Sequence, residues 1–276
     1  MGLRSFIRSV IQMTKEEKVI PIAAPVNTTE LLKGKTVLIT GGSGGIGSAI
    51  AEACLRNSAK VIIAGTRQDK LDRVMEKLQE KENLRSMIID LKDVSSFEQK
   101  VQEAADIFGE IDILINSAGL LARKGFLNMT EEEYDSIMDV NAKGTYFMVQ
   151  AVAKHMIDRK IHGHILNIAS SASLRPAWNP YQMSKWAVRG FTLGASEQLL
   201  PYGIIVNALA PGPVATEMLG RKEGDTIYKA NQPSKRYAVP SELANMAVIL
   251  VSDLSNLVVG DTLFMTGGSG NLDYHN

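Results

Sequence analysis

Several features that would mark particular protein classes are scarce or missing in this sequence. Its 276 residues include one cysteine, Cys54, which excludes an internal disulfide bond. The 30 basic and 30 acidic side chains cancel, so bulk charge predicts no nucleic-acid partner. No apolar run approaches the roughly 18 residues of a membrane-spanning helix, and the 4 histidines lack metal-ligand spacing. We therefore expect a cytoplasmic protein without a metal site.

Short apolar segments alternate with helical patterns along the chain. We predict strands near residues 35–40, 60–65, 85–90, 111–116, 163–169, 203–209 and 260–266. We predict helices near residues 45–57, 69–81, 95–108, 131–157, 181–200 and 241–252. This alternation predicts one α/β domain, in which helices cover both faces of a parallel sheet and ligands bind beyond the carboxyl ends of the strands.

A glycine-rich loop, TGGSGGIG at Thr40–Gly47, joins the first predicted strand to the first predicted helix. Glycines allow close backbone approach, and a helix N-terminus attracts phosphate, so this context predicts a nucleotide-binding loop. No lysine follows the last glycine, which excludes a phosphate loop of the GKS/GKT kind. A second TGGSG, Thr266–Gly270, has no helix after it and is interpreted as a turn.

Tyr181 and Lys185 lie four residues apart in YQMSK, on one face of a predicted helix. A lysine ammonium beside a phenol favours the phenolate and would lower the tyrosine pKa from its usual value of about 10. The pair could then exchange a proton during chemistry. The spacing alone also occurs by chance on exposed helices, so the other motifs decide between these interpretations.

Four further motifs accompany the glycine loop and the Tyr-Lys pair. They are INSAG at 115–119, VNAKG at 140–144, HILNIASSAS at 164–173 and VNALAPGPVAT at 206–216. In this order the motifs resemble those of the short-chain dehydrogenase/reductase family, in its compact single-domain branch, over about Gly34 to Gly268. The resemblance implies a Rossmann-type doubly wound parallel sheet. It also implies an NAD(P)(H)-dependent oxidoreductase that transfers a hydride between nicotinamide and a carbonyl or secondary alcohol.

The resemblance assigns four catalytic residues. Tyr181 is the expected general acid/base, and Lys185 lowers its pKa and holds the nicotinamide ribose. Ser170 is expected to donate a hydrogen bond to the reacting oxygen, and Asn141 to position a water near the lysine. Ser170 lies 11 residues before Tyr181, closer than is usual in the family, so its neighbours Ser171 and Ser173 stay open as alternatives.

The end of the second predicted strand bears on the choice of cofactor. A carboxylate there would bind the ribose of NAD and repel the 2′-phosphate of NADP, whereas this chain has Gly65, Thr66 and Arg67. NADP(H) is therefore favoured, with NAD(H) as the alternative; Arg67 could also be a solvated charge. The residues expected to bind the cofactor are Gly41, Ser43, Gly45, Ile46, Gly47, Arg67, Asp90, Leu91, Asn116, Gly119, Tyr181, Lys185, Val214 and Thr216.

The family's substrate segment corresponds to residues 216–239, which contain more basic than acidic side chains. This excess suggests an anionic substrate, but a solvated lid is the favoured interpretation. Within the reaction class, a 3-oxoacyl thioester reductase competes with a dehydrogenase of sugars, polyols or steroid-like alcohols. A non-catalytic cofactor-binding scaffold is disfavoured because all four catalytic residues are present. An epimerase or dehydratase of the longer branch is disfavoured by the glycine spacing.

Residues 1–33 are expected to form an extension that precedes the domain at 34–276. Within it, Leu3, Phe6, Ile7, Val10 and Ile11 have amphipathic helical spacing. Packing of this helix on the body or on another subunit is favoured over contact of residues 1–13 with a membrane surface. The resemblance also implies a homodimer or homotetramer, formed through helices near 131–157 and 181–200, and a small-molecule substrate.

Overall fold

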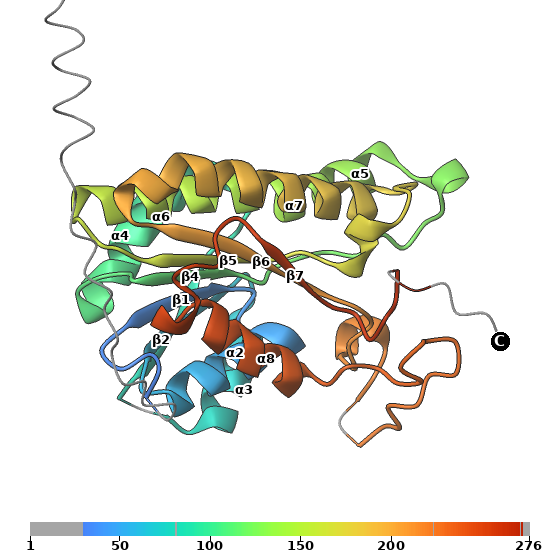
Figure 1. The fold of residues 1–276 in the computed structure, drawn as a ribbon, viewed down its shortest axis with the longest axis horizontal. Coiled ribbons are helices and arrows are strands. Elements are labelled where there is room, and N and C mark those ends of the chain that lie inside the picture. Colours follow the sequence, from blue (N-terminus) through green and yellow to red (C-terminus); the bar gives the residue numbers. More distant parts are fainter. Residues whose placement is uncertain (1–29, 81, 223, 271, 273–276) are drawn as a thin grey trace, which may run out of the picture.

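A computed structural model describes residues 30–270 and 272, apart from residues 81 and 223. Seven parallel strands form one sheet in the order β3-β2-β1-β4-β5-β6-β7 (Figure 1). They are β1 Thr36–Thr40, β2 Lys60–Gly65, β3 Leu84–Ile88, β4 Ile113–Asn116, β5 His164–Ile168, β6 Ile205–Pro211 and β7 Thr262–Met265. The seven predicted strands are confirmed, and so is the predicted Rossmann-type α/β fold.

Helices cover both faces of this sheet (Figure 1). One face carries α2 Gly45–Arg56, α3 Gln68–Leu78 and α8 Pro240–Leu250; the other carries α4 Phe97–Phe108, α6 Thr145–Asp158 and α7 Pro180–Leu199. Short 3-10 turns occupy 94–96, 126–128, 171–174, 200–202, 217–219 and 253–255. The helix predicted over 131–157 is interrupted: α5 Glu131–Met138 leads into a π-helical segment, Asp139–Gly144, before α6 begins.

Alternate residues of the central strands supply two separate cores. Val37 and Ile39 of β1 pack on the side of α2 and α8, whereas Leu38 packs on the side of α4 and α6. All five residues of β1 are buried. A strand covered on both faces has no solvent-facing side, which explains why these strands appear in the sequence as unbroken apolar runs.

The packed body begins slightly before the expected boundary at residue 34. Leu32 is 1% exposed and belongs to the core, and its N–H donates to the carbonyl of Asn57. The amphipathic pattern predicted within residues 1–13 lies outside the described residues. Within the part of the chain that is described, no helix is both long and apolar enough to cross a bilayer.

The strand order brings the ends of β1 and β4 together, although 76 residues separate Thr40 from its partner Asn116. The N–H of Ser117 donates to the carbonyl of Thr40, and the N–H of Gly42 donates to the carbonyl of Ala64. The strand order reverses its direction at this point, since β2 and β3 lie on one side of β1 and β4 to β7 lie on the other. Such a switch point is where ligands bind in open α/β sheets.

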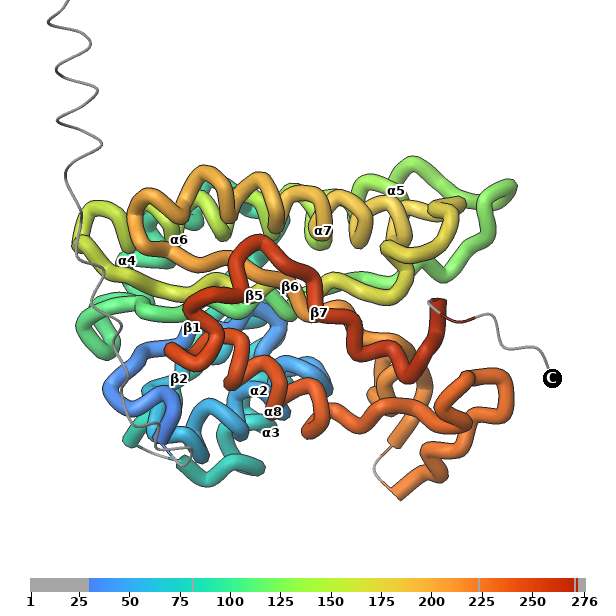
Figure 2. The backbone as a smooth tube through the Cα atoms, viewed as in Figure 1, coloured from blue at the N-terminus to red at the C-terminus, as the bar shows by residue number. Residues whose placement is uncertain are grey.

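The segment 216–239 leaves the end of β6 and returns to the start of α8 as an extended excursion at the carboxyl edge of the sheet (Figure 2). It contains one short 3-10 turn, Glu217–Leu219, and an isolated antiparallel bridge between Tyr228 and Arg236. Its return limb is fixed by a parallel bridge between Val214 and Ala238. The segment is therefore anchored at both ends beside β6.

Candidate active site

The glycine loop lies against the residues that follow β4. Gly41 has a φ of +67°, and a side-chain carbon placed there would lie 2.6 Å from the Cα of Ala118. Only glycine satisfies both conditions without a shift of the backbone. The loop ends at the start of α2, where no side chain caps the helix and no acidic residue occupies the first turn. This arrangement leaves the helix start available to an anion such as a pyrophosphate.

Two other strand ends border the same loop. A side-chain carbon at Gly45 would lie 2.8 Å from Cγ2 of Thr216, which follows β6. On the other side, the hydroxyl of Ser43 lies 3.2 Å from the position that a side-chain carbon would take at Gly65, the end of β2. The loop thus contacts residues following β2, β4 and β6, so the predicted cofactor residues of these segments lie around one site.

Tyr181 and Lys185 lie in the first turns of α7. The helix begins at Pro180, and the side chain of Asn179 caps it by accepting a 2.9 Å hydrogen bond from the N–H of Gln182. Lys185 is 5% exposed, and its Nζ lies 5.9 Å from the centre of the Tyr181 ring. The predicted pairing on one helix face is therefore present.

The pKa of Tyr181 differs from the sequence-based expectation. Burial raises the pKa of Tyr181, and the hydrogen bond with Ser170 opposes this effect. The ammonium of Lys185 donates a 2.7 Å hydrogen bond to the carbonyl oxygen of Ile168. Burial also lowers the pKa of Lys185 to about 8. Desolvation disfavours both charged forms and outweighs the attraction expected from the four-residue spacing.

Ser170 is the serine that the structure brings to Tyr181. It follows β5, its side chain hydrogen-bonds that of Tyr181, and its Oγ accepts a 3.1 Å hydrogen bond from the N–H of Ala172. Ser173 is fully buried, and its hydroxyl donates to the carbonyl of Ser170 at 2.8 Å. Of the open alternatives, Ser173 therefore supports the turn.

Asn141 lies in the π-helical segment and is 1% exposed. Its Oδ1 accepts from the N–H of Leu120 at 2.7 Å, and its Nδ2 donates to the carbonyl of Leu120 at 2.9 Å and to the hydroxyl of Ser184 at 3.1 Å. Ser184 in turn donates to the carbonyl of Tyr181 at 2.7 Å. The Asn141 side chain therefore joins the loop after β4 to α7.

Gly119 marks the space between these groups. A side-chain carbon there would lie 3.5 Å from Oδ1 of Asn141 and 3.8 Å from Nζ of Lys185. The absence of a side chain at this position leaves room beside the lysine. Asn141, Lys185 and the loop after β4 therefore border one space.

The remaining cofactor residues predicted from the sequence occupy different environments. Arg67 is exposed and forms a two-point ion pair with Asp69, at 2.6 and 3.0 Å. Asp90 does not end the third strand as expected, because β3 stops at Ile88; its carboxylate accepts from the N–H of Lys92 at 3.0 Å. The neighbouring Leu91 is buried. These side chains lie beyond the ends of β2 and β3.

Asn116 contributes to a buried polar chain that crosses the sheet. Its side chain hydrogen-bonds that of Thr40 at 3.4 Å, and its Nδ2 donates to Oδ1 of Asn167 at 3.0 Å. Asn167 continues the chain to the hydroxyl of Thr192 on α7 at 3.1 Å. Neither Asn167 nor Thr192 was predicted from the sequence as part of the site. The asparagine within the apolar run HILNI was the available signal, because buried amides require partners.

The sequence predicts neither a metal site nor an internal disulfide bond. Among the described residues, no group of three His, Cys, Asp or Glu side chains could hold a metal ion. Cys54 is fully buried, and burial raises the pKa of its thiol to about 12. It is a core residue, as its position on the apolar stripe of α2 predicts.

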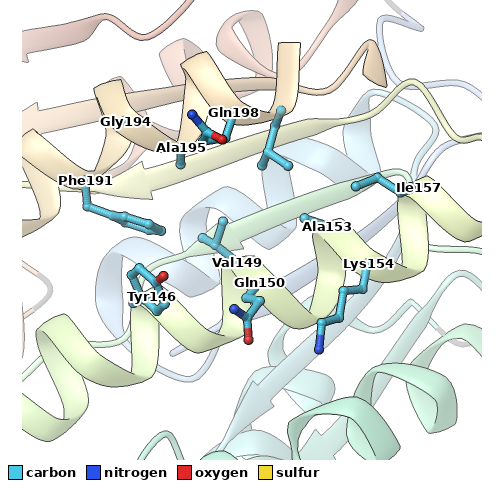
Figure 3. A pocket seen from close by; sticks show the side chains of 11 residues that line it. Tyr146, Val149, Gln150, Ala153, Lys154, Ile157, Phe191, Gly194, Ala195 and Gln198 are labelled. Atoms are coloured by element: carbon cyan, nitrogen blue, oxygen red, sulfur yellow. The ribbon is translucent and has the colours of Figure 1, made fainter. Parts of the chain in front are cut away.

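A hollow of about 420 Å³ lies away from the Ser-Tyr-Lys group, on the outer side of α6 and α7 (Figure 3). Tyr146, Val149 and Ala153 line it from α6, and Phe191 and Ala195 line it from α7. The rings of Tyr146 and Phe191 meet across it, with centres 4.8 Å apart. None of the predicted catalytic or cofactor residues lines this hollow.

Comparison with known proteins places these features in context. Residues 35–226 match the model of the family described as short chain dehydrogenase. The chain is 35% identical over 245 residues to gluconate 5-dehydrogenase of Gluconobacter oxydans, covering 86% of this chain and 95% of the relative. It is 32% identical over 243 residues to a 3-oxoacyl-[acyl-carrier-protein] reductase of Aquifex aeolicus, covering 86% and 98%.

A solved structure is also similar to this chain in fold and sequence. The crystal structure of a gluconate 5-dehydrogenase from Burkholderia cenocepacia, in complex with NADP and tartrate, aligns with a TM-score of 0.80 and 31% identity. The alignment covers 89% of this chain and 99% of that one. The similarity therefore extends over nearly the whole described body.

Proposed function

This chain belongs to the short-chain dehydrogenase/reductase family of oxidoreductases, and from that premise we propose that it transfers a hydride between the nicotinamide of NADP(H) and a small carbonyl or secondary alcohol. The main support is the hydrogen bond between Ser170 and Tyr181 with Lys185 buried behind them. An acid/base group, an oxygen-binding hydroxyl and a cation thereby meet beside the glycine loop. The alternative of a non-catalytic scaffold gives no reason for this arrangement.

Each residue has a distinct role in the proposed reaction. When bound, NADP(H) supplies the hydride in reduction and accepts it in oxidation. Tyr181 gives its hydroxyl proton to the substrate oxygen as negative charge develops there, and it takes the proton back in oxidation. Ser170 donates a hydrogen bond to the same oxygen. Lys185, which is still mostly protonated at pH 7, stabilises the phenolate that Tyr181 leaves behind.

Asn141 is proposed as a positioning residue. Its side chain is engaged by Leu120 and Ser184, and Ser184 bonds the backbone of Tyr181. Asn141 therefore orients the start of α7. We keep for Asn141 the role that the resemblance implies, which is to position a water near Lys185.

The described residues fit a dinucleotide. The glycine loop and the uncapped start of α2 suit the pyrophosphate. NADP(H) is favoured because no carboxylate ends β2 at Gly65 and Ser43 lies beside it; NAD(H) is the alternative. We propose that the dinucleotide is held by Gly41, Ser43, Gly45, Ile46, Gly47, Arg67, Asp90, Leu91, Asn116, Gly119, Tyr181, Lys185, Val214 and Thr216.

Among substrates, we favour a polyhydroxy carboxylic acid over a 3-oxoacyl thioester. Gluconate 5-dehydrogenases occur both among the sequence relatives and among the similar solved structures. Basic side chains in the segment 216–239 suit an anionic substrate. The reductase of Aquifex aeolicus keeps the thioester as the second candidate.

We also propose a homodimer or homotetramer formed through α6 and α7. Tyr146 on α6 is 45% exposed and Leu193 on α7 is 63% exposed, beside the hollow between the two helices. Light scattering of wild type and Leu193→Glu would test this: the variant should dissociate. The cytoplasmic location expected from the sequence stays a prediction.

The test of the proposed function is the oxidation of NADPH and NADH against a panel of carbonyl compounds. The panel contains 5-keto-D-gluconate, a 3-oxoacyl thioester, diketones and cyclic ketones. We expect turnover with NADPH and at least one panel member, fastest with the keto acid. Binding of NADPH without turnover of any carbonyl would overturn the proposal in favour of a scaffold.

A further inference from the structure

Two basic side chains of the segment 216–239 converge on one buried phenol. Tyr237 is 7% exposed, and its hydroxyl oxygen lies 3.4 Å from Nη2 of Arg221 and 3.2 Å from Nζ of Lys229. Both cations also lie over its ring, 4.9 and 4.7 Å from the centre. Cation–π attraction thus holds the charged groups of Arg221 and Lys229 against the ring of Tyr237.

This cluster is attached to the residues that follow β6 at the proposed cofactor site. Tyr237 precedes Ala238, which forms the parallel bridge with Val214 and accepts a hydrogen bond from the N–H of Ala215. The N–H of Arg221 donates to the carbonyl of Thr216 at 3.0 Å. Arg221 and Tyr237 are thus tied by their backbones to the residues that follow β6, next to the glycine loop.

The two cations have no ion-pair partner among the described side chains. The neighbouring Arg236, by contrast, forms a two-point ion pair with Glu242 at 2.6 and 2.8 Å. Asp225 attracts Arg221 only weakly and at longer range, and its carboxylate accepts from the N–H of Lys222 at 2.8 Å. Two positive charges within about 7 Å of each other, as both lie near one oxygen, repel unless an anion joins them.

The two cations also affect the ionisation of the Tyr237 hydroxyl. Hydrogen bonds from Arg221 and Lys229 lower the pKa of Tyr237. Even an ionised phenol would carry one negative charge against two cations, so the cluster keeps a net positive charge. The solvated-lid interpretation fits exposed Lys222 and paired Arg236, but it does not explain why Arg221 and Lys229 converge.

We propose that Arg221 and Lys229, held on Tyr237, bind an anionic group of the substrate, a carboxylate or a phosphate, at the end remote from its reacting carbonyl. This inference rests on the proposed oxidoreductase function and specifies its substrate class. A planar guanidinium binds a carboxylate at two points, and an ammonium adds a third hydrogen bond. The segment then selects charged substrates over neutral ones of the same shape.

Matched substrates test the charge requirement. 5-Keto-D-gluconate and L-sorbose share their ketone and differ in a carboxylate against a hydroxymethyl group; D-fructose 6-phosphate and D-fructose are the corresponding phosphate pair. We expect kcat/KM to be at least about tenfold higher for the charged member of one pair, as a charge-assisted hydrogen bond predicts. The pair that responds identifies the anion. Equal kcat/KM values within both pairs would overturn the inference.

Variants assign the effect to the cluster. Arg221→Gln and Lys229→Gln should each raise KM for the charged substrate about tenfold, with kcat within about threefold and KM for NADPH unchanged. Lys222→Gln, which removes an exposed charge from the same segment, is the matched control and should leave KM within about twofold. Lys229→Arg should restore the wild-type KM. An equal loss of NADPH affinity would show that the cluster binds the cofactor instead.

Inhibition extends the test to any carbonyl that the enzyme reduces. Tartrate should inhibit the wild type competitively against the carbonyl, and the two glutamine variants should lose this inhibition. If carbonyls are reduced but neither tartrate nor inorganic phosphate inhibits, the inference fails and the proposed function stands. If no carbonyl is reduced with either nucleotide, the proposed function itself fails.

Discussion

The Nζ of Lys185 donates a 2.7 Å hydrogen bond to the carbonyl oxygen of Ile168, the last residue of β5. This bond joins the interior of α7 to the strand that ends two residues before Ser170. Ser170 hydrogen-bonds Tyr181, one turn before Lys185 on the same helix. Strand end, serine, tyrosine and lysine therefore form a closed circuit, in which displacing one member disturbs the others.

Removal of the Tyr181 hydroxyl should abolish turnover. We expect Tyr181→Phe to lower kcat by about 10²- to 10⁴-fold, because the proton donor is lost. Cofactor affinity should stay within a few fold, since the ring remains in place. Stopped-flow reduction and fluorescence titration with NADPH measure the two quantities. Tyr202→Phe, which changes an exposed tyrosine in the 3-10 turn after α7, is the control. Unchanged turnover in Tyr181→Phe would sink the acid/base assignment.

Replacement of Arg67 should change the preference between the two nucleotides. We expect Arg67→Ala to weaken NADPH binding more than NADH binding, because only NADPH carries a 2′-phosphate. Asp69→Asn should strengthen NADPH binding, since it releases the guanidinium from its ion pair. Titration of each variant with both nucleotides measures this.

Arg73→Ala is the control for that experiment, because Arg73 also contacts Asp69 and is exposed. An equal loss of NADPH and NADH affinity in Arg67→Ala would identify Arg67 as a surface charge and reopen NAD(H) as the cofactor.

The contact between Gly45 and Thr216 should respond to a methyl group. We expect Gly45→Ala to weaken NADPH binding by about tenfold or more, because the new carbon would lie 2.8 Å from Cγ2 of Thr216 and displace it. Thr216→Ser removes Cγ2 and keeps the hydroxyl. The double variant should recover most of the lost affinity in calorimetric titrations. A double variant as weak as Gly45→Ala would place the damage in the loop alone.

Burial of Lys185 should make the stability of the ligand-free protein depend on pH. Its pKa is lowered to about 8, below the value of about 10.4 for an exposed lysine. Between these values the unfolded chain binds more protons, so stability should rise from pH 7 to pH 9 by about 1 kcal/mol. Urea unfolding at pH 7, 8 and 9 should show this rise in the wild type and not in Lys185→Met. Lys222→Met should behave as wild type; a parallel rise in both variants would contradict the prediction.

Local sequence patterns predicted the strands of the sheet and the position of the glycine loop. Continuous apolar runs such as KTVLI located buried strands, and glycines located the loop between β1 and α2. The order of motifs placed Tyr181, Lys185 and Ser170 near one another, because strand ends meet at one edge of a parallel sheet. These predictions rest on short-range periodicity and chain direction, which a sequence displays directly.

Contacts between distant segments could not be predicted in the same way. The bonds of Asn141 to Leu120 and Ser184 join three elements, and the raised pKa of Tyr181 depends on burial that the four-residue spacing does not reveal. His164 begins β5 and is 6% exposed, although its polar side chain gives no sign of burial in the sequence.

The π-helical segment Asp139–Gly144 has a consequence for how this chain tolerates changes in length. The hydrogen-bonded turn of a π-helix spans one residue more than that of an α-helix. Deletion of one residue here would regularise the helix and rotate all of α6 by about 100° against α5. Asn141 would then face away from Leu120, and the apolar side of α6 would leave the sheet. Substitutions can therefore be accommodated at many positions of this segment. The number of residues between Thr130 and Thr145 is fixed, because it sets the rotation of α6 relative to α5.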